Sequence, residues 1–496
     1  MKKLFFLERI VIFFLFLSLF NLKTGYFEEI SVLMGNRRNN YSPSPSYDRI
    51  CRLACDRNAR IHFIGIGGVS MYSLARLTAI MGAQVSGSDR ESNERTKDLS
   101  LLGIRISIGH NENNVSDSDL VVHSHAISDD NPELCEARRL DIPTVSRAEY
   151  LGAIMLGYNT RIGVSGSHGK STTVAMLDTI FSRLASDPTV LSGSDLPIGS
   201  PIRIGSKGVM IYEACEYKDS FLRFSPIIAI ALNLEFDHPD YFESIDFLRD
   251  SFVKALSRAG RLAILNGDDE NLVSIIKDVK APVITFGSGE KNDYRYSITD
   301  YREIGFEFTL SRFGSVIRSF EINVPGAFNV HNATAAIVTA MEYGIDADAV
   351  AEAIKEYRGI SGRLELIGKR FGRRVYCDYA HHPTEIISSI NALKGIIREP
   401  LTVVFKPHTF SRTQALWSEF CEALSQADHL ILTDIYPARE SPIEGITSER
   451  LASSIGGAIY CSDENVISFV DRRTAGSILL MGAGNMEKIK QEIITK

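Results

Sequence analysis

The order of apolar and polar residues predicts short buried strands that alternate with amphipathic helices along most of the chain. The first example is residues 60–64, RIHFI, an apolar run that ends on the glycine turn of residues 65–68. Apolar residues then recur at helical spacing, at Met71, Leu74, Leu77 and Met81. With further strands expected over residues 83–89 and 118–124, this order predicts a Rossmann-like layer.

The middle of the chain repeats the alternation. A strand over residues 162–165 precedes a second glycine turn and a helix whose apolar face is formed by Val174, Leu177, Phe181 and Leu184. Near-continuous apolar runs at residues 208–214 and 227–234 suit a parallel sheet that is buried on both faces. Residues 292–324 alternate Tyr, Phe, Ile and Val with polar residues, which predicts an antiparallel edge.

A third series of strands follows a connection with Gly and Ser at residues 357–363. These strands are expected at residues 374–378, 401–405, 429–434 and 476–484. A chain of 496 residues is long enough for several domains. We predict a leader or linker followed by three α/β domains, over residues 1–57, 58–157, 158–356 and 357–496.

The N-terminus fits this pattern poorly. The apolar run from Ile10 to Leu22 is short for a membrane span, and no A-x-A cleavage site follows it. Two interpretations remain: a real signal or anchor, or upstream sequence with Met34 as the true start, which we favour. Membrane contact is expected only if residues 1–22 are a real anchor. Residues 35–49 are predicted to form a disordered linker.

Charge and cysteine content narrow the class of protein. The net charge of -7 argues against a general nucleic-acid surface, so we expect no nucleic-acid partner. The seven cysteines are scattered, odd in number and without a C-x-x-C pair. This predicts neither a disulfide framework nor a zinc site, and it favours a reducing, cytoplasmic location.

Residues 161–173, RIGVSGSHGKSTT, carry the clearest chemical signal. They resemble a phosphate-binding loop, G-x-x-x-x-G-K-[ST], but Val164 stands where its first glycine is expected. Backbone N–H groups of such a loop bind phosphate oxygens, Lys170 would bridge the terminal phosphates, and the Ser171 hydroxyl would ligate Mg²⁺. The alternative is a chance G-K-S on an exposed turn, which the flanking strand and helix disfavour.

Two further groups follow central strands. Glu213 ends a buried strand and is a candidate to hold a metal or position water; alternatively, Glu213 or Glu216 is simply exposed at the strand end. His238 lies between Asp237 and Asp240 and is a candidate metal ligand oriented by a carboxylate. The alternative for His238 is a histidine in a polar turn.

Other candidates lie further along the chain. Asn329 and Asn332 share a helix face and suit an adenine edge, unless Asn329 is a helix cap. Arg363 suits charge stabilisation on a phosphoryl group, unless it is a surface arginine. After two later strands, Arg412 suits binding of a substrate carboxylate, unless these loops are merely solvated. The candidate residues of the two loops are Asp378, His381, His382, His408 and Arg412.

Taken in order, these segments resemble the Mur ligases, and most closely their alanine-adding branch. The segments are GIGG, GSHGKSTT, YEACE, NLEFDH, GAFNVHN, GRLE, DYAHHPTE and PHTFSRT, and the resemblance spans residues 58–496. The family loop reads G-T-x-G-K-[ST]-[ST], which accounts for Val164, and Ser167 replaces its threonine. The resemblance implies a Rossmann-like N-terminal domain, a central P-loop ATPase-like domain and a Rossmann-like C-terminal domain.

The resemblance also implies an activity and its cofactors, ATP and Mg²⁺. The carboxylate of UDP-N-acetylmuramate would be phosphorylated by ATP, and the amine of L-alanine would then displace phosphate from the acyl phosphate. The catalytic residues implied are Lys170, Glu213, His238, Arg363 and Asp378. The ATP-binding residues implied are Gly166, Ser167, His168, Gly169, Lys170, Ser171, Thr172, Asn329, Asn332 and Arg363. The metal ligands implied are Ser171, Glu213 and His238, and the amino-acid-binding residues are Asp378, His381 and Arg412.

In the first domain, the resemblance implies that Gly65, Gly67 and Gly68 bring the backbone close to the UDP-sugar. Asp89 also suits the ribose of a dinucleotide, but Ser70 occupies the third fingerprint position, which favours UDP over NAD. The family pattern is not kept at Cys215 and Lys218, where acids are common, or at Thr409, where many members have arginine.

Four hypotheses therefore stand. They are the alanine-adding ligase as a monomer or dimer, a recycling ligase that adds a peptide to the same UDP-sugar, an NAD-dependent dehydrogenase, and a UDP-sugar-binding protein with a decayed site.

Overall fold

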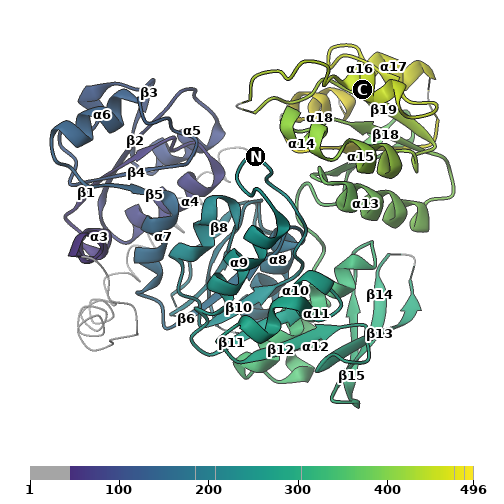
Figure 1. Cartoon of the computed structure of the whole chain (residues 1–496), viewed down its shortest axis with the longest axis horizontal. Coiled ribbons are helices and arrows are strands. Elements are labelled where there is room, and N and C mark those ends of the chain that lie inside the picture. Colours follow the sequence, from purple (N-terminus) through teal and green to yellow (C-terminus); the bar gives the residue numbers. More distant parts are fainter. Residues whose placement is uncertain are drawn as a thin grey trace, which may run out of the picture.

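The computed structural model describes residues 45–494, except residues 185, 207, 303, 439, 474 and 485. Three sheets, each covered by helices, follow one another along the chain and form three lobes (Figure 1). The predicted α/β class is confirmed. The signal, anchor or alternative start expected in residues 1–34 lies outside the described residues. Within the described part of the chain, no helix combines the length and apolar content that a membrane crossing requires.

The N-terminal domain has a five-stranded parallel sheet in the order β3-β2-β1-β4-β5. Its strands are β1 Arg60–Ile64, β2 Gln84–Asp89, β3 Arg105–Ile108, β4 Leu120–His123 and β5 Thr144–Ser146. Its helices are α3 Pro45–Cys55, α4 Val69–Ile80, α5 Glu94–Leu101, α6 Pro132–Arg139 and α7 Arg147–Met155. This is the predicted Rossmann-like layer, with the glycine turn between β1 and α4.

The linker predicted over residues 35–49 is wrong for residues 45–49, which form the start of α3. The sequence from Ile50 to Ala54 places apolar residues on one side of this helix, and Cys51 and Ala54 are buried in the core. Helix α3 packs against α7, so it belongs to the folded part of the chain. Polar composition hid this helix because only its second half carries the apolar residues.

The central domain has a ten-stranded sheet in the order β15-β14-β13-β12-β11-β10-β6-β9-β7-β8. Its strands are β6 Thr160–Ser165, β7 Thr189–Leu191, β8 Ile202–Arg203, β9 Val209–Glu213, β10 Ile228–Ala231, β11 Leu262–Asn266, β12 Val283–Gly287, β13 Tyr294–Tyr301, β14 Phe306–Arg312 and β15 Ser315–Ile322. Its helices are α8 Lys170–Arg183, α9 Ile245–Leu256, α10 Glu270–Ile275, α11 Phe328–Tyr343 and α12 Ala347–Ile354. The antiparallel edge predicted for residues 292–324 is confirmed by β13, β14 and β15.

The C-terminal domain has a six-stranded sheet in the order β16-β17-β21-β18-β19-β20. Its strands are β16 Glu365–Arg370, β17 Arg373–Asp378, β18 Leu401–Phe405, β19 His429–Leu432, β20 Ile459–Tyr460 and β21 Ser477–Met481. Its helices are α13 Pro383–Ile396, α14 Phe410–Ala415, α15 Trp417–Leu424, α16 Ser448–Ser453, α17 Val466–Arg473 and α18 Glu487–Ile494. All neighbouring pairs are parallel except β16 with β17.

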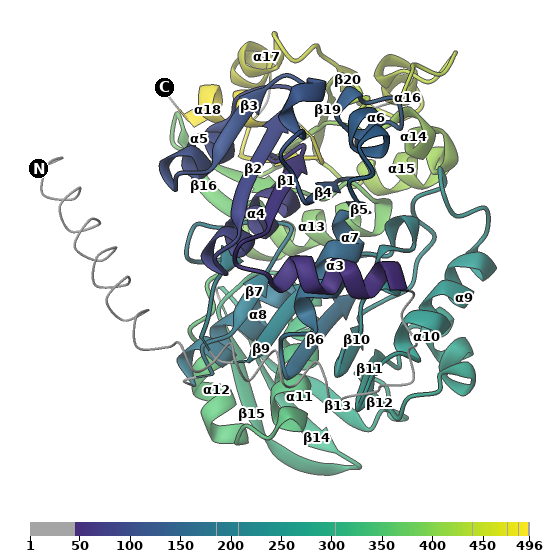
Figure 2. The same ribbon diagram turned by 90° about the vertical axis from the view of Figure 1, so that its left-hand side faces the viewer.

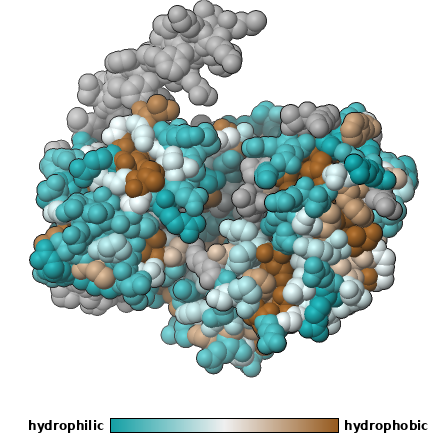
Figure 3. Space-filling view, turned by 90° about the horizontal axis from the view of Figure 1, so that it is seen from above, coloured by the Kyte–Doolittle hydropathy of each residue, from teal (hydrophilic) through white to brown (hydrophobic). Residues whose placement is uncertain are grey.

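The first two domains share a hydrophobic core, whereas the C-terminal domain has its own. One cluster is continuous from the N-terminal domain to one face of the central sheet, where Tyr150 and Met155 share it with Phe221 and Phe224. The buried cores on the two faces of the C-terminal sheet contain only residues of that domain. Helix α3 lies between the first two domains (Figure 2). Seen from above, the surface is hollowed between the N-terminal and C-terminal domains (Figure 3). The first two domains are therefore joined by apolar packing.

Candidate active site

The loop between β6 and α8 is shaped by two glycines with left-handed backbone angles. Gly166 has φ 134° and Gly169 has φ 82°, a region that residues with a side chain rarely adopt. A Cβ atom on Gly169 would lie 2.5 Å from Oδ1 of Asn332. The loop is also held by the segment that follows β10, because Asn233 Oδ1 accepts a hydrogen bond from the His168 N–H at 2.8 Å. The loop is therefore built into the fold, and a chance match on an exposed turn is wrong.

The loop ends where α8 begins, and this helix start suits an anion. No side chain caps the N-terminus of α8, so its first backbone N–H groups face the loop, with the positive end of the helix dipole. Ser171 and Thr172 lie in this first turn and are buried. An uncapped helix start behind a glycine loop fits a phosphate group, which would take the place of the missing cap.

Lys170 points back into the loop and is paired with an acid. Its Nζ lies 3.2 Å from both carboxylate oxygens of Glu216 and also donates to the Gly166 carbonyl. Burial alone would lower the pKa of Lys170, but the charge of Glu216 outweighs it and raises that pKa above its ordinary value. Lys170 is therefore a fixed cation beside the phosphate site.

The alternative in which Glu216 is merely exposed at a strand end is wrong. Glu216 is only 2% exposed and lies between Lys170 and His238, whose Nε2 is 3.9 Å from Glu216 Oε1. Glu213, at the end of β9, accepts hydrogen bonds from Ser192 Oγ at 3.0 Å and from the Gly193 N–H. Two acids thus lie at this strand end. The oxygen donors of Ser171 and Glu213 are of the type that Mg²⁺ prefers.

His238 lies next to a residue that contacts the C-terminal domain. Its ring packs on Tyr217 at 4.6 Å between centroids, and its neighbour Asp237 accepts hydrogen bonds from Nε and Nη2 of Arg412 at 3.1 and 2.8 Å. Burial opposes the charge on Asp237, but Arg412 and nearby histidines hold the pKa of this carboxyl well below its usual range. His238 is thus one residue away from a buried ion pair between two domains.

Asn329 and Asn332 lie in the first turns of α11, as predicted, and are linked. Asn329 Nδ2 donates to the Pro325 carbonyl at 2.7 Å, and Asn332 Nδ2 donates to Asn329 Oδ1 at 3.3 Å. Asn329 does not cap the helix, because the N-cap residue is Ala327. Asn332 therefore faces Gly169, behind the phosphate loop.

On the C-terminal side, Arg363 and Asp378 lie close to each other. The guanidinium of Arg363 stacks on the Tyr379 ring at 5.2 Å, and its Nη1 is 3.7 Å from Glu385 Oε1. The Nε atom of Arg363 is buried and makes no hydrogen bond, so this side chain has a donor left for a ligand. The surface-arginine alternative is therefore wrong.

Asp378 is buried at the end of β17 and accepts the backbone N–H groups of Leu364 and Ala380 at 2.8 and 2.7 Å. Burial raises the pKa of Asp378 to about 6, against the opposing effect of Arg363. A carboxylate with such a pKa is suited to exchanging a proton near neutral pH.

His381, His408 and Arg412 form a group beside Asp378. Nη1 of Arg412 is 3.0 Å from Nδ1 of His408, and Arg412 is 5% exposed, so the solvated-loop alternative is wrong here. Burial lowers the pKa of His381 to about 4 and that of His408 to about 3. Both rings are therefore neutral at pH 7, and Arg412 is the cation of this group; a substrate carboxylate would have to share it with Asp237.

Thr409 starts α14 with φ 68°, which is strained for a β-branched residue. Such strain concentrates at functional sites, and the Thr409 hydroxyl accepts the backbone N–H of Arg412 at 3.4 Å.

The glycines of the first domain lie in a different sheet, between β1 and α4. Gly65 has φ 80°, Gly68 is the N-cap of α4 and has no side chain to cap it, and Gly67 donates its N–H to Asp89 Oδ2 at 2.8 Å. Asp89 therefore orders the glycine turn itself, which removes the main reason for a dinucleotide.

The structure brings most of the predicted residues to one seam between the central and C-terminal domains, with the glycines of residues 65–68 apart from it. Sequence reasoning missed four acids at the seam, namely Glu216, Glu235, Asp237 as the partner of Arg412, and Glu385. Their positions directly beside predicted residues, in YEACE, NLEFDH and HPTE, were the available signal.

Comparisons with known proteins agree with this architecture. Three family patterns match in series: "Mur ligase family, catalytic domain" at residues 60–159, "Mur ligase middle domain" at 164–340, and "Mur ligase, glutamate ligase domain" at 362–487. Two relatives named UDP-N-acetylmuramate–L-alanine ligase, from Acetivibrio thermocellus and Alkaliphilus metalliredigens, are each 40% identical. They cover 86% and 88% of this chain and 94% and 97% of their own.

A crystal structure of a UDP-N-acetylmuramate–alanine ligase from Thermotoga maritima is also similar. It has a TM-score of 0.75 and 28% identity and covers 88% of this chain and 98% of its own. A murein peptide ligase from Psychrobacter arcticus shares the fold, with a TM-score of 0.68, 23% identity and the same coverage of the two chains. With three family patterns in order and relatives of similar length, this chain belongs to the Mur ligase family.

Proposed function

We propose that this chain joins L-alanine to the carboxylate of UDP-N-acetylmuramate, driven by ATP. The observation that carries the proposal is that a phosphate loop of one domain and a carboxylate–arginine pair of another face the same seam. Relatives that carry this activity in their names match nearly full length. We also propose domain boundaries near those of the sequence prediction, with α3 added to the first domain.

In the first step, a carboxylate oxygen of the UDP-sugar attacks the γ-phosphorus of ATP, and ADP leaves. Lys170 and Arg363 neutralise charge on the phosphoryl oxygens, since this transfer depends mainly on positioning and electrostatics. The loop from Gly166 to Thr172 holds the phosphates, and Asn329 and Asn332 lie on the nucleotide side. Mg²⁺, which would be held by Ser171, Glu213 and His238, neutralises phosphate charge when bound.

In the second step, the amine nitrogen of L-alanine attacks the acyl carbon, and phosphate leaves with the bonding electrons. Asp378 accepts the proton that the amine loses, which its pKa of about 6 permits. His381 and Arg412 hold the amino acid, with Arg412 shared between Asp237 and the substrate carboxylate. Gly65, Gly67 and Gly68, which have no side chains, let the backbone approach the UDP diphosphate.

The proposed setting follows from these substrates. ATP and a UDP-sugar are supplied in the cytoplasm, and the seven cysteines form no disulfide within the described residues, which suits that compartment. We propose a monomer or dimer that requires no partner for the reaction.

Amino-acid selectivity tests the proposal. Phosphate release by the full chain with ATP, Mg²⁺ and UDP-N-acetylmuramate is measured with one amino acid at a time. We expect release that requires the UDP-sugar and is fastest with L-alanine. Release that is fastest with a tripeptide would move the chain to the recycling reaction, and NAD reduction would overturn both.

A further inference from the structure

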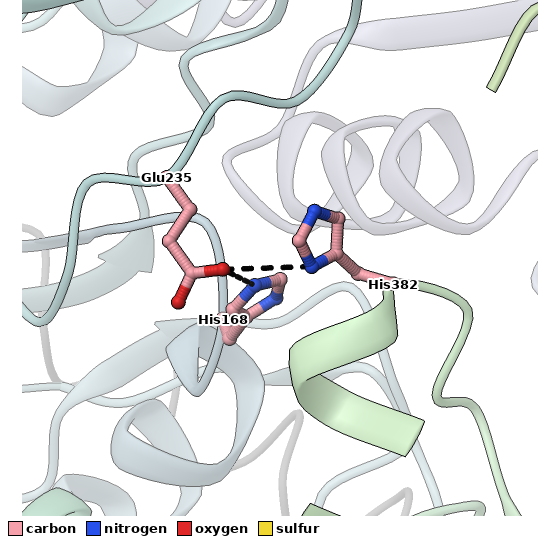
Figure 4. A group of neighbouring side chains, drawn as sticks. All are labelled: His168, Glu235 and His382. Atoms are coloured by element: carbon pink, nitrogen blue, oxygen red, sulfur yellow. Dashed lines mark hydrogen bonds and ion pairs between the residues drawn. The ribbon is translucent and has the colours of Figure 1, made fainter. Parts of the chain in front are cut away.

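A compact group of nitrogen and oxygen donors lies at the seam, beside the residues used above. His168 comes from the phosphate loop, Glu235 from the segment after β10, and His382 from the residue before α13, so two domains contribute (Figure 4). Glu235 Oε2 lies 3.3 Å from His168 Nε2 and 3.5 Å from His382 Nδ1. The donor atoms of the three residues all lie within 4.8 Å of one another.

His382 is the unusual member of this group. It is only 6% exposed, yet neither of its ring nitrogens makes a hydrogen bond. Buried polar atoms are normally paired because leaving them without a partner costs free energy. Its Nδ1 points at the Glu235 carboxylate (Figure 4), so this histidine is aimed into the group. A ligand at the centre of the group would satisfy it.

We propose that His168, Glu235 and His382 form a binding site for a divalent transition-metal ion of the zinc type. Two imidazoles and one carboxylate are a donor set that zinc takes in proteins, with a fourth position left open. With bond lengths of about 2.0–2.1 Å to nitrogen and about 2.0–2.2 Å to a carboxylate oxygen, tetrahedral geometry separates neighbouring donors by roughly 3.3–3.5 Å. Two of the three donor separations already match that range.

The surroundings favour a cation at this point. A second carboxylate, Glu385, lies 3.2 Å from Nδ1 of His168. Glu235 is in addition fixed by the C-terminal domain, because Thr384 Oγ1 donates to Glu235 Oε2 at 2.7 Å. Such a hydrogen bond orients the carboxylate, as outer partners of metal ligands commonly do.

This site differs in chemistry from the Mg²⁺ site proposed above. Mg²⁺ prefers oxygen donors, whereas two imidazole nitrogens favour zinc, cobalt or nickel. Excess Mg²⁺ should therefore fail to displace a zinc-type ion from His168, Glu235 and His382. Because the ligands come from two domains, a bound ion would also hold the C-terminal domain against the phosphate loop.

Equilibrium dialysis of the full chain against Co²⁺ or Zn²⁺ in excess Mg²⁺ tests the site at constant pH, since protons compete for imidazole nitrogens. We expect one tightly bound ion, with the visible absorption of tetrahedral Co²⁺. His382→Gln should weaken binding at least 100-fold, and Thr384→Val, which loses only the outer hydrogen bond, about 10- to 100-fold. His429→Gln is the matched control, because His429 is an exposed histidine on β19.

Two outcomes would overturn the proposal. One is that a folded His382→Gln variant, checked by its melting transition, binds the ion as tightly as the unchanged protein. The other is that Mg²⁺ displaces the ion, which would assign the binding to oxygen donors. If the site is right, Zn²⁺ should slow proteolytic cleavage between the central and C-terminal domains, and His382→Gln should abolish this protection. These readouts are independent of ligase activity.

Discussion

At the scale of single residues, the seam depends on charges that are buried and paired. Lys170 and Glu216 are such a pair, since their side chains are 15% and 3% exposed. Removing one partner of a buried pair costs more than removing both, because the remaining charge is left without compensation. Comparing a variant that lacks Lys170 with one that lacks both charges therefore distinguishes a catalytic role of Lys170 from a structural one.

We predict that Lys170→Met abolishes phosphate release and lowers stability by about 3 kcal/mol, because Glu216 is left buried and unpaired. The double variant Lys170→Met, Glu216→Gln should regain most of the stability but none of the activity. Thermal unfolding and phosphate release of both variants provide the check. Recovery of activity in the double variant would show that Lys170 only neutralises Glu216.

Asp378 predicts a pH dependence. Its carboxyl must be ionised to accept the amine proton, and its pKa is raised to about 6. The rate at saturating L-alanine should therefore fall about tenfold per pH unit below that value. Asp378→Asn should be nearly inactive and lack this acid limb. A rate that stays constant down to about pH 5 would remove Asp378 from the proton transfer.

In the N-terminal domain, the environment of Glu133 leads us to predict that acid lowers the stability of the fold, independently of the effect of pH on catalysis. It is fully buried, which alone would raise its pKa, but hydrogen bonds with Ser88, Asn114 and His110, together with His62 Nε2 at 3.7 Å, lower that pKa to about 2. Because the folded-state pKa lies below the unfolded value, this stabilisation is present above about pH 4.5 and is lost as pH falls towards 2.

Glu133→Gln should therefore lower the melting temperature at pH 7 and reduce the further loss on acidification between about pH 4.5 and 2. Glu112→Gln, an exposed acid in the same domain, is the control. Parallel acid curves for Glu133→Gln and the unchanged protein would contradict the hydrogen-bond account.

At the scale of elements, the start of α8 is the decisive feature. Gly169 combines a positive φ with the 2.5 Å approach of Asn332 to the place of a Cβ atom. Gly199 has a similar φ of 72° but open space around it. Comparing substitutions at the two glycines therefore distinguishes the cost of the backbone angle from the cost of the contact with Asn332 of α11.

We predict that Gly199→Ala costs about 1 kcal/mol, the usual penalty for a side chain at a left-handed angle. Gly169→Ala should cost more and also weaken ATP binding, because Asn332 and the loop have to move apart. Chemical unfolding and nucleotide titration measure both effects. Equal costs and unchanged nucleotide affinity would show that Asn332 does not support the loop.

The elements themselves could largely be predicted from the sequence. Apolar runs such as residues 60–64 and 401–405 coincide with β1 and β18, because buried parallel strands leave a continuous apolar signature. The run at residues 227–234 extends past the end of β10 at Ala231, since Leu232 and Leu234 are also buried, although Asn233 between them turns towards the phosphate loop and bonds His168. Burial can be read from apolar residues, whereas the point where a strand ends depends on tertiary contacts.

The site could be predicted only in part. Motifs supplied Lys170, Glu213, His238 and Asp378, but not Glu216 as the partner of Lys170. Contacts between domains, such as that of Asp237 with Arg412 across 175 residues of sequence, leave no periodic pattern in the chain.

At the scale of the whole molecule, the C-terminal domain has its own apolar cores. Polar contacts join it to the central domain at the seam, from Arg412 to Asp237 and from Thr384 to Glu235. Such contacts exchange for water at little cost, so this domain is the one expected to move during turnover.

We predict that Arg412→Ala loosens this closure without unfolding either domain. The radius of gyration from small-angle scattering should increase, and the KM for L-alanine should rise. Lys394→Ala, which removes a surface pair with Asp428 inside the C-terminal domain, should change neither quantity. An unchanged radius of gyration for Arg412→Ala would show that the pair does not hold the domains together.

The most direct test of the proposed reaction is the stoichiometry of its products. The full chain is mixed with ATP, Mg²⁺, UDP-N-acetylmuramate and L-alanine, and ADP and the new amide are quantified by mass spectrometry over time. We predict one amide of UDP-N-acetylmuramate with L-alanine for each ADP, and no amide with Lys170→Met. ADP formed without amide, or no reaction from a folded chain that binds ATP, would contradict ligation by this seam.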